Sequence, residues 1–373
     1  MRQRQGRWMG RFWMRRVGCE GRVPLPAGPW PWSTFLFLER TIVIMSEKSS
    51  SAKIPHENWL LHIKRGFRKL FRPLVRLKDI DLRVQNIEQR LALMEAFSHG
   101  GRTTYMGEGL VLVKAIVNGV QIIYLVEATD RLIAPWFIAT GLYETELTQH
   151  FCRILRKDDH CLDIGANFGY FTLLFGRFCP QGKAIGVEAD AALFKIARDN
   201  IHINHLGRNT FIYHFAICET ERELTLFRRV GRSGNTSIAK PAEDFLDYIG
   251  EAPGVEFSVQ GVSIDQFFKY FGGKLDIIKI DIEGAEPLAF AGAQSVIAAN
   301  PDLQIVMEWS PGQIQAAGFD VGEFLGKLSG MGLRFFRLDP ALTEMSSDEF
   351  LNISYAPGIL LAKNPRYGLQ KHV

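Results

Sequence analysis

The chain has 373 residues, of which 47% are hydrophobic and 23% charged, the composition of an ordinary globular protein with a sizeable core. This excludes a wholly disordered chain, a collagen-like chain and a coiled-coil rod. No run of about 18 apolar residues occurs, so a membrane-spanning helix is not expected. Five cysteines with no Cys-x-x-Cys pair fit a reducing, cytoplasmic compartment better than a disulfide framework.

The net charge of +4 hides an uneven distribution. Residues 1–45 carry eight arginines against two glutamates, a net +6, and residues 46–78 carry nine lysines and arginines against two glutamates, a net +7. Residues 79–373 therefore have a net charge of −9. A nucleic-acid enzyme is expected to carry a basic face on its working domain. The distribution therefore argues against nucleic acid as the main substrate.

Residues 1–45 contain four of the seven tryptophans, many Arg, Gly and Pro, and no apolar period. Met45 then opens a polar stretch, SEKSSSAK, that is typical of a protein start. A basic targeting arm is one reading, but no continuous apolar run or small-residue cleavage site follows the arginines. We favour a misassigned start, and we expect a disordered extension outside the fold.

Residues 46–104 are predicted to form a basic helical segment. The stretch WLLHIKRGFRKLFRPLVRLK, residues 59–78, mixes basic and apolar residues at helical spacing, with a bend or break at Pro73. Such a helix suits either an anionic membrane surface or packing on its own domain or a partner. A short coiled-coil seam follows at heptad spacing, formed by Ile80, Val84, Ile87, Leu91 and Met94. Residues 59–97 are thus candidates for peripheral membrane contact or for a homodimer.

Residues 105–373 are predicted to form one α/β domain. It begins with a β-hairpin over residues 110–126, because Asn118-Gly119 between β-rich runs favours a tight turn. A helix is predicted over 142–155, and strands and helices then alternate, which favours a mostly parallel sheet with helices on both faces. The predicted strands are 160–164, 184–188, 210–216, 275–280, 303–307, 333–338 and 358–362, and two of the predicted helices are 170–178 and 191–204.

A glycine-rich turn follows the first strand of this alternation, in CLDIGANFGYFTLLFG, residues 161–176. Gly165, Asn167 and Gly169 make a tight loop before a helix, where a ligand can approach the backbone beside a helix N-terminus. Nicotinamide and flavin enzymes also use such a turn. The spacing here is Gly-x-Asn-x-Gly rather than Gly-x-Gly-x-x-Gly. Asp163 precedes it at the strand end, where a carboxylate can bind a cationic group of a ligand but would repel a pyrophosphate.

Acidic residues end the neighbouring strands. Glu188 ends the next strand, at a place where an acid accepts hydrogen bonds from both ribose hydroxyls. Asp281 is followed at once by Glu283 and Glu286, and Glu308 ends the strand after that. Placing these carboxylates close together costs free energy unless a cation, a proton or a metal neutralises their charge.

These motifs resemble a known family. The ordered set closely resembles the FkbM-type S-adenosylmethionine-dependent methyltransferases from about Asp130 to Asn364; it comprises GLYETE, DIGANFGYFT, GVEAD, NIHIN, VSIDQF, IKIDIEGAE and IVMEWS. The resemblance implies a class I methyltransferase (Rossmann-like) fold, with a seven-stranded, mostly parallel sheet whose last strand is antiparallel. It also implies S-adenosylmethionine as donor and a hydroxyl acceptor on a sugar, glycan, glycolipid or secondary metabolite.

The resemblance also implies residue roles. Residues expected to line the methionine and ribose side of the donor are Asp163, Gly165, Asn167 and Gly169. Glu188 would bind the ribose hydroxyls. Asp281 would face the sulfonium, close to the acceptor.

Two routes exist for removing the acceptor's proton. Glu283 or Glu286 can act as general base, or Asp281 and Glu308 can hold a divalent cation such as Mg²⁺. We favour the base. In the loop 228–238, Asn235 and Ser237 are candidates for acceptor contact.

Two other functions are weighed against this one. A nicotinamide-dependent oxidoreductase on a related fold would need a Gly-x-Gly-x-x-Gly turn and a hydride-handling His or Tyr-Lys pair, and neither is evident. A non-catalytic interaction protein that uses the N-terminal helices would be expected to have lost the acids of its pocket, and they are present.

Overall fold

The computed structural model describes residues 102–241, Leu246 and 254–366, and every structural statement below concerns these residues. The predicted extension 1–45 and the predicted membrane or dimer segment 59–97 lie outside the described residues and stay predictions. The described helices include none that is both long and apolar enough to cross a membrane.

The predicted hairpin is confirmed as part of a three-stranded sheet. Strand β2, Leu110–Val117, pairs antiparallel with β3, Val120–Glu127, across Asn118 (φ 47°) and Gly119 (φ 77°). A further strand, β1 (Arg102–Gly107), pairs with β2. Strand β1 begins within the last three residues of the segment predicted over 46–104, where the sequence RTTYMG is β-rich and pairs with the hairpin.

Two helices connect this sheet to the main domain: α4, which was not predicted, and α5, which corresponds to the helix predicted over 142–155. Helix α4, Ala134–Thr140, ends at Gly141, whose φ of 72° stops the helix in the left-handed region. Helix α5, Thr145–Ile154, begins only after Glu144, which itself has φ 41°. The positive φ at Glu144 explains why the helix begins three residues later than its apolar pattern predicted.

The main sheet has eight strands in the order β13-β12-β14-β11-β10-β4-β5-β6. Neighbouring strands from β11 to β6 pair in parallel, whereas the last strand, β14, is antiparallel to both of its neighbours, as expected. The expected seven strands are joined by an eighth, the two-residue β13. The strands are β4 Cys161–Ile164, β5 Ala184–Glu188, β6 Thr210–His214, β10 Ile277–Ile280, β11 Gln304–Trp309, β12 Arg334–Arg337, β13 Glu344–Met345 and β14 Ala356–Ala362.

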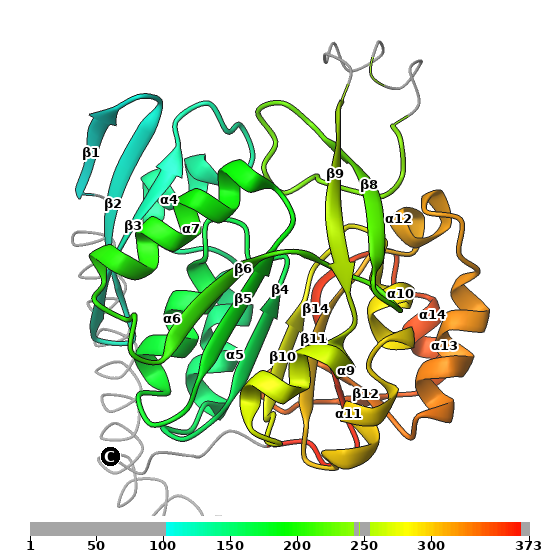
Figure 1. Cartoon of the computed structure of the whole chain (residues 1–373). Helices are drawn as coiled ribbons and strands as arrows, with labels where there is room; N and C mark the ends of the chain where they lie inside the picture. Colours follow the sequence, from blue (N-terminus) through cyan, green and yellow to red (C-terminus); the bar gives the residue numbers. More distant parts are fainter. Residues whose placement is uncertain (1–101, 242–245, 247–253, 367–373) are drawn as a thin grey trace, which may run out of the picture. The chain divides into compact units, whose positions relative to one another are not determined.

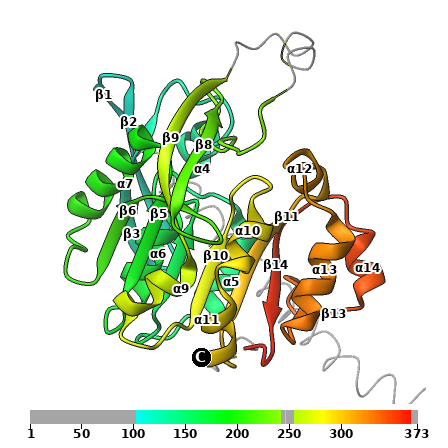
Figure 2. The same ribbon diagram turned by 45° about the vertical axis from the view of Figure 1, so that its right-hand side comes forward.

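Helices cover the main sheet, and α7 lies at one end of it while α13 and α14 lie at the other (Figure 1, Figure 2). On β4 and β10, Cys161 and Ile277 face a core shared with α5 and α6, whereas Leu162 and Ile278 face a core shared with α10, α11 and α13. The helices are α6 Tyr170–Phe178, α7 Ala191–Ile203, α9 Ile264–Phe267, α10 Glu286–Ala291, α11 Gln294–Ala299, α12 Pro311–Ala316, α13 Val321–Gly330 and α14 Ser347–Leu351.

A small second sheet, of order β7-β9-β8, projects from the main one (Figure 1). It consists of β7 (Ala216–Ile217), β8 (Arg222–Arg228) and β9 (Val255–Val262). The strand predicted over 210–216 is therefore divided at Phe215 between two sheets. Strand β9 was not predicted. Leu224 and Leu226 of β8 are buried and reach the cavity described below.

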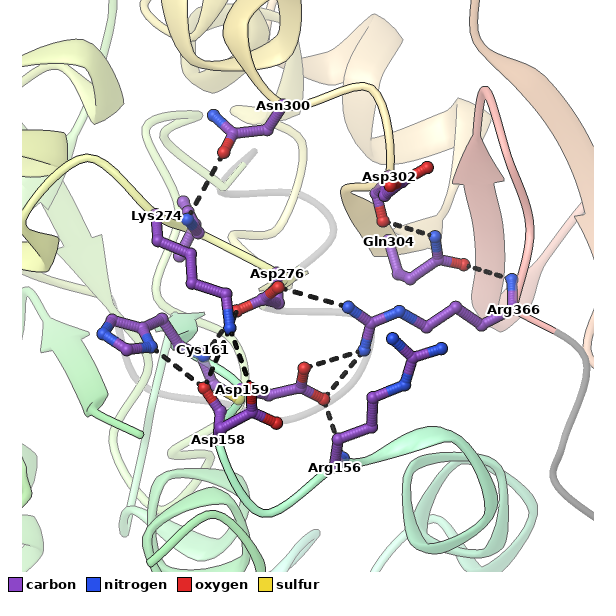
Figure 3. A network of polar contacts seen from close by, with 12 residues as sticks. Arg156, Asp158, Asp159, Cys161, Lys274, Asp276, Asn300, Asp302, Gln304 and Arg366 are labelled. Atoms are coloured by element: carbon purple, nitrogen blue, oxygen red, sulfur yellow. Dashed lines mark hydrogen bonds and ion pairs between the residues drawn. The ribbon is translucent and has the colours of Figure 1, made fainter. Parts of the chain in front are cut away.

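An ionic network lies at the end of the main sheet where the central strands β4, β10 and β11 begin (Figure 3). Arg366, which follows β14, contacts Asp159 at 2.8 Å and Asp276 at 3.2 Å. Its backbone amide also donates to Gln304 at 2.8 Å. Asp159 and Arg366 are almost fully buried, so these contacts fix the end of β14 to the starts of the central strands.

Candidate active site

A cavity of about 1030 Å³, counting its open mouth, lies where β4, β5, β10 and β11 end. The predicted site residues that line it are Gly165, Asn167, Glu188, Asp281, Glu283 and Glu308, whereas Asp163, Gly169 and Glu286 are not among its lining residues. The lining therefore brings together most, but not all, of the residues that the sequence singled out.

The turn after β4 has the backbone that its glycines predicted. Gly165 has φ +76°, and a Cβ built on it would lie 1.8 Å from the backbone oxygen of Asp281, so no larger residue fits. Gly169 has φ +82° and packs against Ala197 of α7. Gly165 thus allows the ends of β4 and β10 to approach, while Gly169 sets α6 against α7.

Glu188 joins this turn to the end of β5. Its Oε2 accepts a hydrogen bond from the backbone amide of Asn167 at 2.7 Å, and its Oε1 accepts one from that of Asp190 at 2.8 Å. Burial raises the pKa of Glu188 to about 7, against the opposing effect of these two amides. Each carboxylate oxygen has a further lone pair with which to accept a hydrogen bond from a ligand hydroxyl.

Asp163 lies on the same sheet face as Lys279, directly opposite it in the strand register. Its Oδ2 accepts a hydrogen bond from the Thr172 hydroxyl at 2.6 Å, and its Oδ1 lies 3.9 Å from the Lys279 ammonium. Burial raises the pKa of Asp163, and Lys279 opposes that rise. Only 1% of the surface of Asp163 is exposed. Asp163 can therefore influence the cavity only through the residues that it contacts, Lys279 and Thr172.

Three carboxyl groups meet in the cavity where β10 and β11 end. One oxygen each from Asp281, Glu283 and Glu308 lies within 4.8 Å of the others. Burial, followed by the charge of Asp281, raises the pKa of Glu308 to about 10, and the same two causes raise that of Glu283 well above its ordinary value. Oε2 of Glu308 is buried, and none of the described residues forms a hydrogen bond with it. A cluster of this kind shares protons or holds a cation.

Two polar neighbours position Glu283, which has φ 55°. Gln313 of α12 donates a hydrogen bond from Nε2 to Oε2 of Glu283. The Ser237 hydroxyl donates to the Glu283 backbone oxygen at 2.9 Å. Ser237 therefore contacts the backbone of the site, and from the same loop Ser233 and Thr236, rather than Asn235, reach the cavity lining.

Glu286 braces the loop that carries Asp281 and Glu283. It is the first residue of α10 and is buried, and its Oε1 accepts hydrogen bonds from the backbone amides of Ile282 at 3.2 Å and Gly284 at 3.4 Å. Burial raises its pKa to about 7. These contacts satisfy one oxygen of Glu286 within its own loop.

Sequence reasoning missed several residues here. Tyr143 lines the cavity, and Glu144 beside it has a pKa raised to about 8, chiefly by burial and then by Asp281. Both lie in the GLYETE motif, which indicated a resemblance to the FkbM-type methyltransferases but no role for its individual residues. Lys279 also lines the cavity, and its signal was present: a lysine inside a four-residue buried strand, IIKI, requires a partner.

Comparison with protein families gives a match to the Methyltransferase FkbM domain over residues 163–335. This span begins at Asp163 and ends in β12, and it is narrower than the range from Asp130 to Asn364 that the motifs had suggested. The search of curated proteins gives no match.

Solved structures similar to the chain include the methyltransferase FkbM from Methylobacillus flagellatus KT, at 12% identity and TM-score 0.33, with 62% of this chain and 48% of that one covered. A TehB-like SAM-dependent methyltransferase from Corynebacterium glutamicum has 12% identity and TM-score 0.32 over 62% and 94%. The O-methyltransferase from Bacillus cereus in complex with SAH has 14% identity and TM-score 0.30 over 59% and 80%. The chain thus spans about half of the Methylobacillus protein.

Proposed function

We propose that the cavity binds S-adenosylmethionine, and the match of residues 163–335 to the methyltransferase FkbM domain supports this. We further propose that its methyl group passes to a hydroxyl of a sugar, glycan, glycolipid or secondary metabolite. One observation carries the proposal: among the described residues, the cavity is lined by four carboxyl groups, those of Glu188, Asp281, Glu283 and Glu308, and by one ammonium, that of Lys279. Lys279 is itself paired with Asp281.

This lining favours a cationic ligand. Burial raises the pKa of Glu283 and Glu308 and so favours their protonated forms, and a nearby cation lowers that pKa and favours the carboxylates. The sulfonium and the ammonium of S-adenosylmethionine have this effect, whereas the pyrophosphate of a nicotinamide cofactor would make the acids still harder to ionise. The acidic lining therefore supports the methyltransferase reading over the oxidoreductase alternative.

The donor is held, in this proposal, by the turn and by two acids. Gly165 and Asn167 let the ligand approach the backbone where β4 ends. Glu188 accepts hydrogen bonds from the ribose hydroxyls, and Asp281 faces the sulfonium. Asp163 and Gly169 act indirectly, through Lys279 and through the packing of α6 on α7.

The chemical step is a displacement at the methyl carbon. The acceptor hydroxyl gives its proton to Glu283, its oxygen bonds to the methyl carbon, and the carbon–sulfur bond breaks with its electron pair left on sulfur. The products are a methyl ether, S-adenosylhomocysteine and protonated Glu283. The raised pKa of Glu283 makes it a stronger base once it is ionised, and Gln313 orients it. Holding oxygen, carbon and sulfur in line supplies the remaining rate enhancement.

A divalent cation is the competing route for activating the hydroxyl. Asp281, Glu283 and Glu308 can offer three carboxylate oxygens, and such ligands suit Mg²⁺. We favour the base because Lys279 and Gln313 already satisfy part of the cluster. Activity is to be measured with and without EDTA: full activity supports the base, and complete loss that Mg²⁺ reverses supports the metal.

Calorimetry with S-adenosylmethionine and, separately, with NADH tests the donor. We expect micromolar-range binding of the first and none of the second. Binding of NADH alone would support the oxidoreductase, and binding of neither would support the interaction protein. The acceptor is to be sought by untargeted metabolomics of a deletion strain, as a glycan or lipid that has lost a methyl group.

A further inference from the structure

Lys279 occupies an unusual place for a lysine. It lies in the middle of β10, a strand with no exposed residue, and only 4% of its own surface is exposed. Its Nζ lies 3.0 Å from Oδ2 of Asp281 and 3.9 Å from Oδ1 of Asp163. It also lies 5.2 Å from the ring centroid of Phe171 in α6. One ammonium thus stands between a fully buried acid and an acid of the cavity.

The strand geometry requires this arrangement. Asp163 lies opposite Lys279 in the register of β4 and β10, and Asp281 lies two residues after Lys279, so all three side chains project from the same face of the sheet. Burial by itself lowers the pKa of Lys279, but Asp281 and Asp163, together with Glu144, raise it above its ordinary value. Lys279 therefore remains an ammonium at neutral pH and is excluded as the general base.

We propose that Lys279 is a positioning residue that holds Asp281 through Oδ2 and so turns Oδ1 toward the sulfonium of the donor. This inference rests on the proposed function and deepens it. Within the described part of the chain, Oδ2 of Asp281 is the oxygen that takes the Lys279 contact. The Asp281 side chain remains 24% exposed and lines the cavity, as a ligand contact requires.

A purely structural role makes a different prediction. If Lys279 served only to neutralise Asp163, replacing both residues by neutral ones would leave the cavity unchanged. The variant Lys279→Met with Asp163→Asn separates the two roles, because it removes the buried pair together and leaves Asp281 in place. It also avoids leaving Asp163 as an uncompensated buried charge, which is the costly outcome of a single substitution.

The readout is the preference for S-adenosylmethionine over S-adenosylhomocysteine, measured as two Kd values by calorimetry on the full chain. The two ligands differ in the sulfonium charge and its methyl group. In the double variant we expect the Kd of S-adenosylmethionine to rise roughly tenfold, as for a displaced charge-assisted contact. The Kd of S-adenosylhomocysteine should change less than about threefold.

Arg366→Met is the matched control. Arg366 is also a buried cation between two acids, Asp159 and Asp276, but it lies where the same strands begin (Figure 3). Its loss should lower stability and leave the ligand preference as in the wild type. Asp281→Asn is the reference for a lost preference, and adding the Lys279 change to it should have no further effect.

The outcomes separate the inference from the function. A folded double variant that keeps the wild-type preference overturns the role of Lys279 and leaves the proposed function standing. A wild-type protein that binds neither ligand overturns both. Should circular dichroism show that the double variant does not fold, Lys279→Gln with Asp163→Asn, which keeps a polar side chain at both positions, is measured in the same way. An unchanged preference in that variant again overturns the inference.

Discussion

The backbone amide of Asn167 donates a 2.7 Å hydrogen bond to Oε2 of Glu188. One carboxylate thereby joins the glycine turn after β4 to the end of β5, the two segments that frame the ribose side of the proposed donor site. Because Oε1 accepts from the amide of Asp190, Glu188 shapes the loop on both sides and still has lone pairs for a ligand. Its substitution is therefore expected to affect binding more than global folding.

Glu188→Ala is expected to weaken S-adenosylmethionine binding by about 1.5–3 kcal/mol, because two charge-assisted hydrogen bonds to the ribose are lost. Glu188→Gln, which keeps one acceptor oxygen, should weaken it less. Calorimetry gives both affinities, and circular dichroism confirms folding. Wild-type affinity in a folded Glu188→Ala protein would remove Glu188 from the site.

Glu283→Gln is expected to lower kcat by about 10²–10⁴-fold while donor affinity stays near that of the wild type. Since the base must be ionised and its pKa is raised well above the ordinary value of a glutamate, wild-type kcat should still increase with pH above the range in which an ordinary glutamate ionises. Initial rates of S-adenosylhomocysteine formation with an accepted hydroxyl compound measure both effects. Glu286→Gln is the comparison, because Glu286 is held by its own loop. Full activity in both variants would exclude both acids as the essential base.

Glu286 should make stability depend on pH. Its pKa rises from an ordinary 4.5 to about 7 on burial, so the folded state binds this proton more tightly than the unfolded state. The corresponding stabilisation is complete below pH 4.5 and is lost as the pH rises through 7. The wild type loses this stabilisation as the pH rises, and Glu286→Gln does not. Relative to the wild type, the free energy of unfolding of Glu286→Gln should therefore increase by about 1–3 kcal/mol from pH 5 to pH 8. Urea unfolding measures this difference, and the exposed Glu323→Gln should show none.

A variant that begins at Met45 is expected to fold and to methylate like the full chain. The reason is compositional: residues 1–45 are rich in Trp and Arg, lack Lys and show no apolar period. Thermal unfolding and rate measurements on both proteins compare them. Failure of the shorter protein to fold would show that residues 1–45 belong to the structure.

Much of the domain was predictable because its signals are local. A four- or five-residue apolar run bounded by glycine predicts a buried strand, and β5 and α6 begin and end where the sequence indicated. Gly165 predicted its own turn, since a positive φ there excludes other residues. Strand β9 was not predicted, because its buried and exposed residues alternate and its sequence contains no continuous apolar run.

The sequence by itself determined which acids end which strands, because the carboxyl ends of parallel strands meet at one edge of the sheet. Only the tertiary structure decided which acids reach the cavity, since that depends on side-chain direction. Asp163 projects toward Lys279 and Thr172, and Glu286 turns back to its own loop. Glu308 comes within reach of Asp281 only because β11 pairs beside β10. Strand register, a long-range property, placed Lys279 opposite Asp163, and no local pattern in the chain encodes that register.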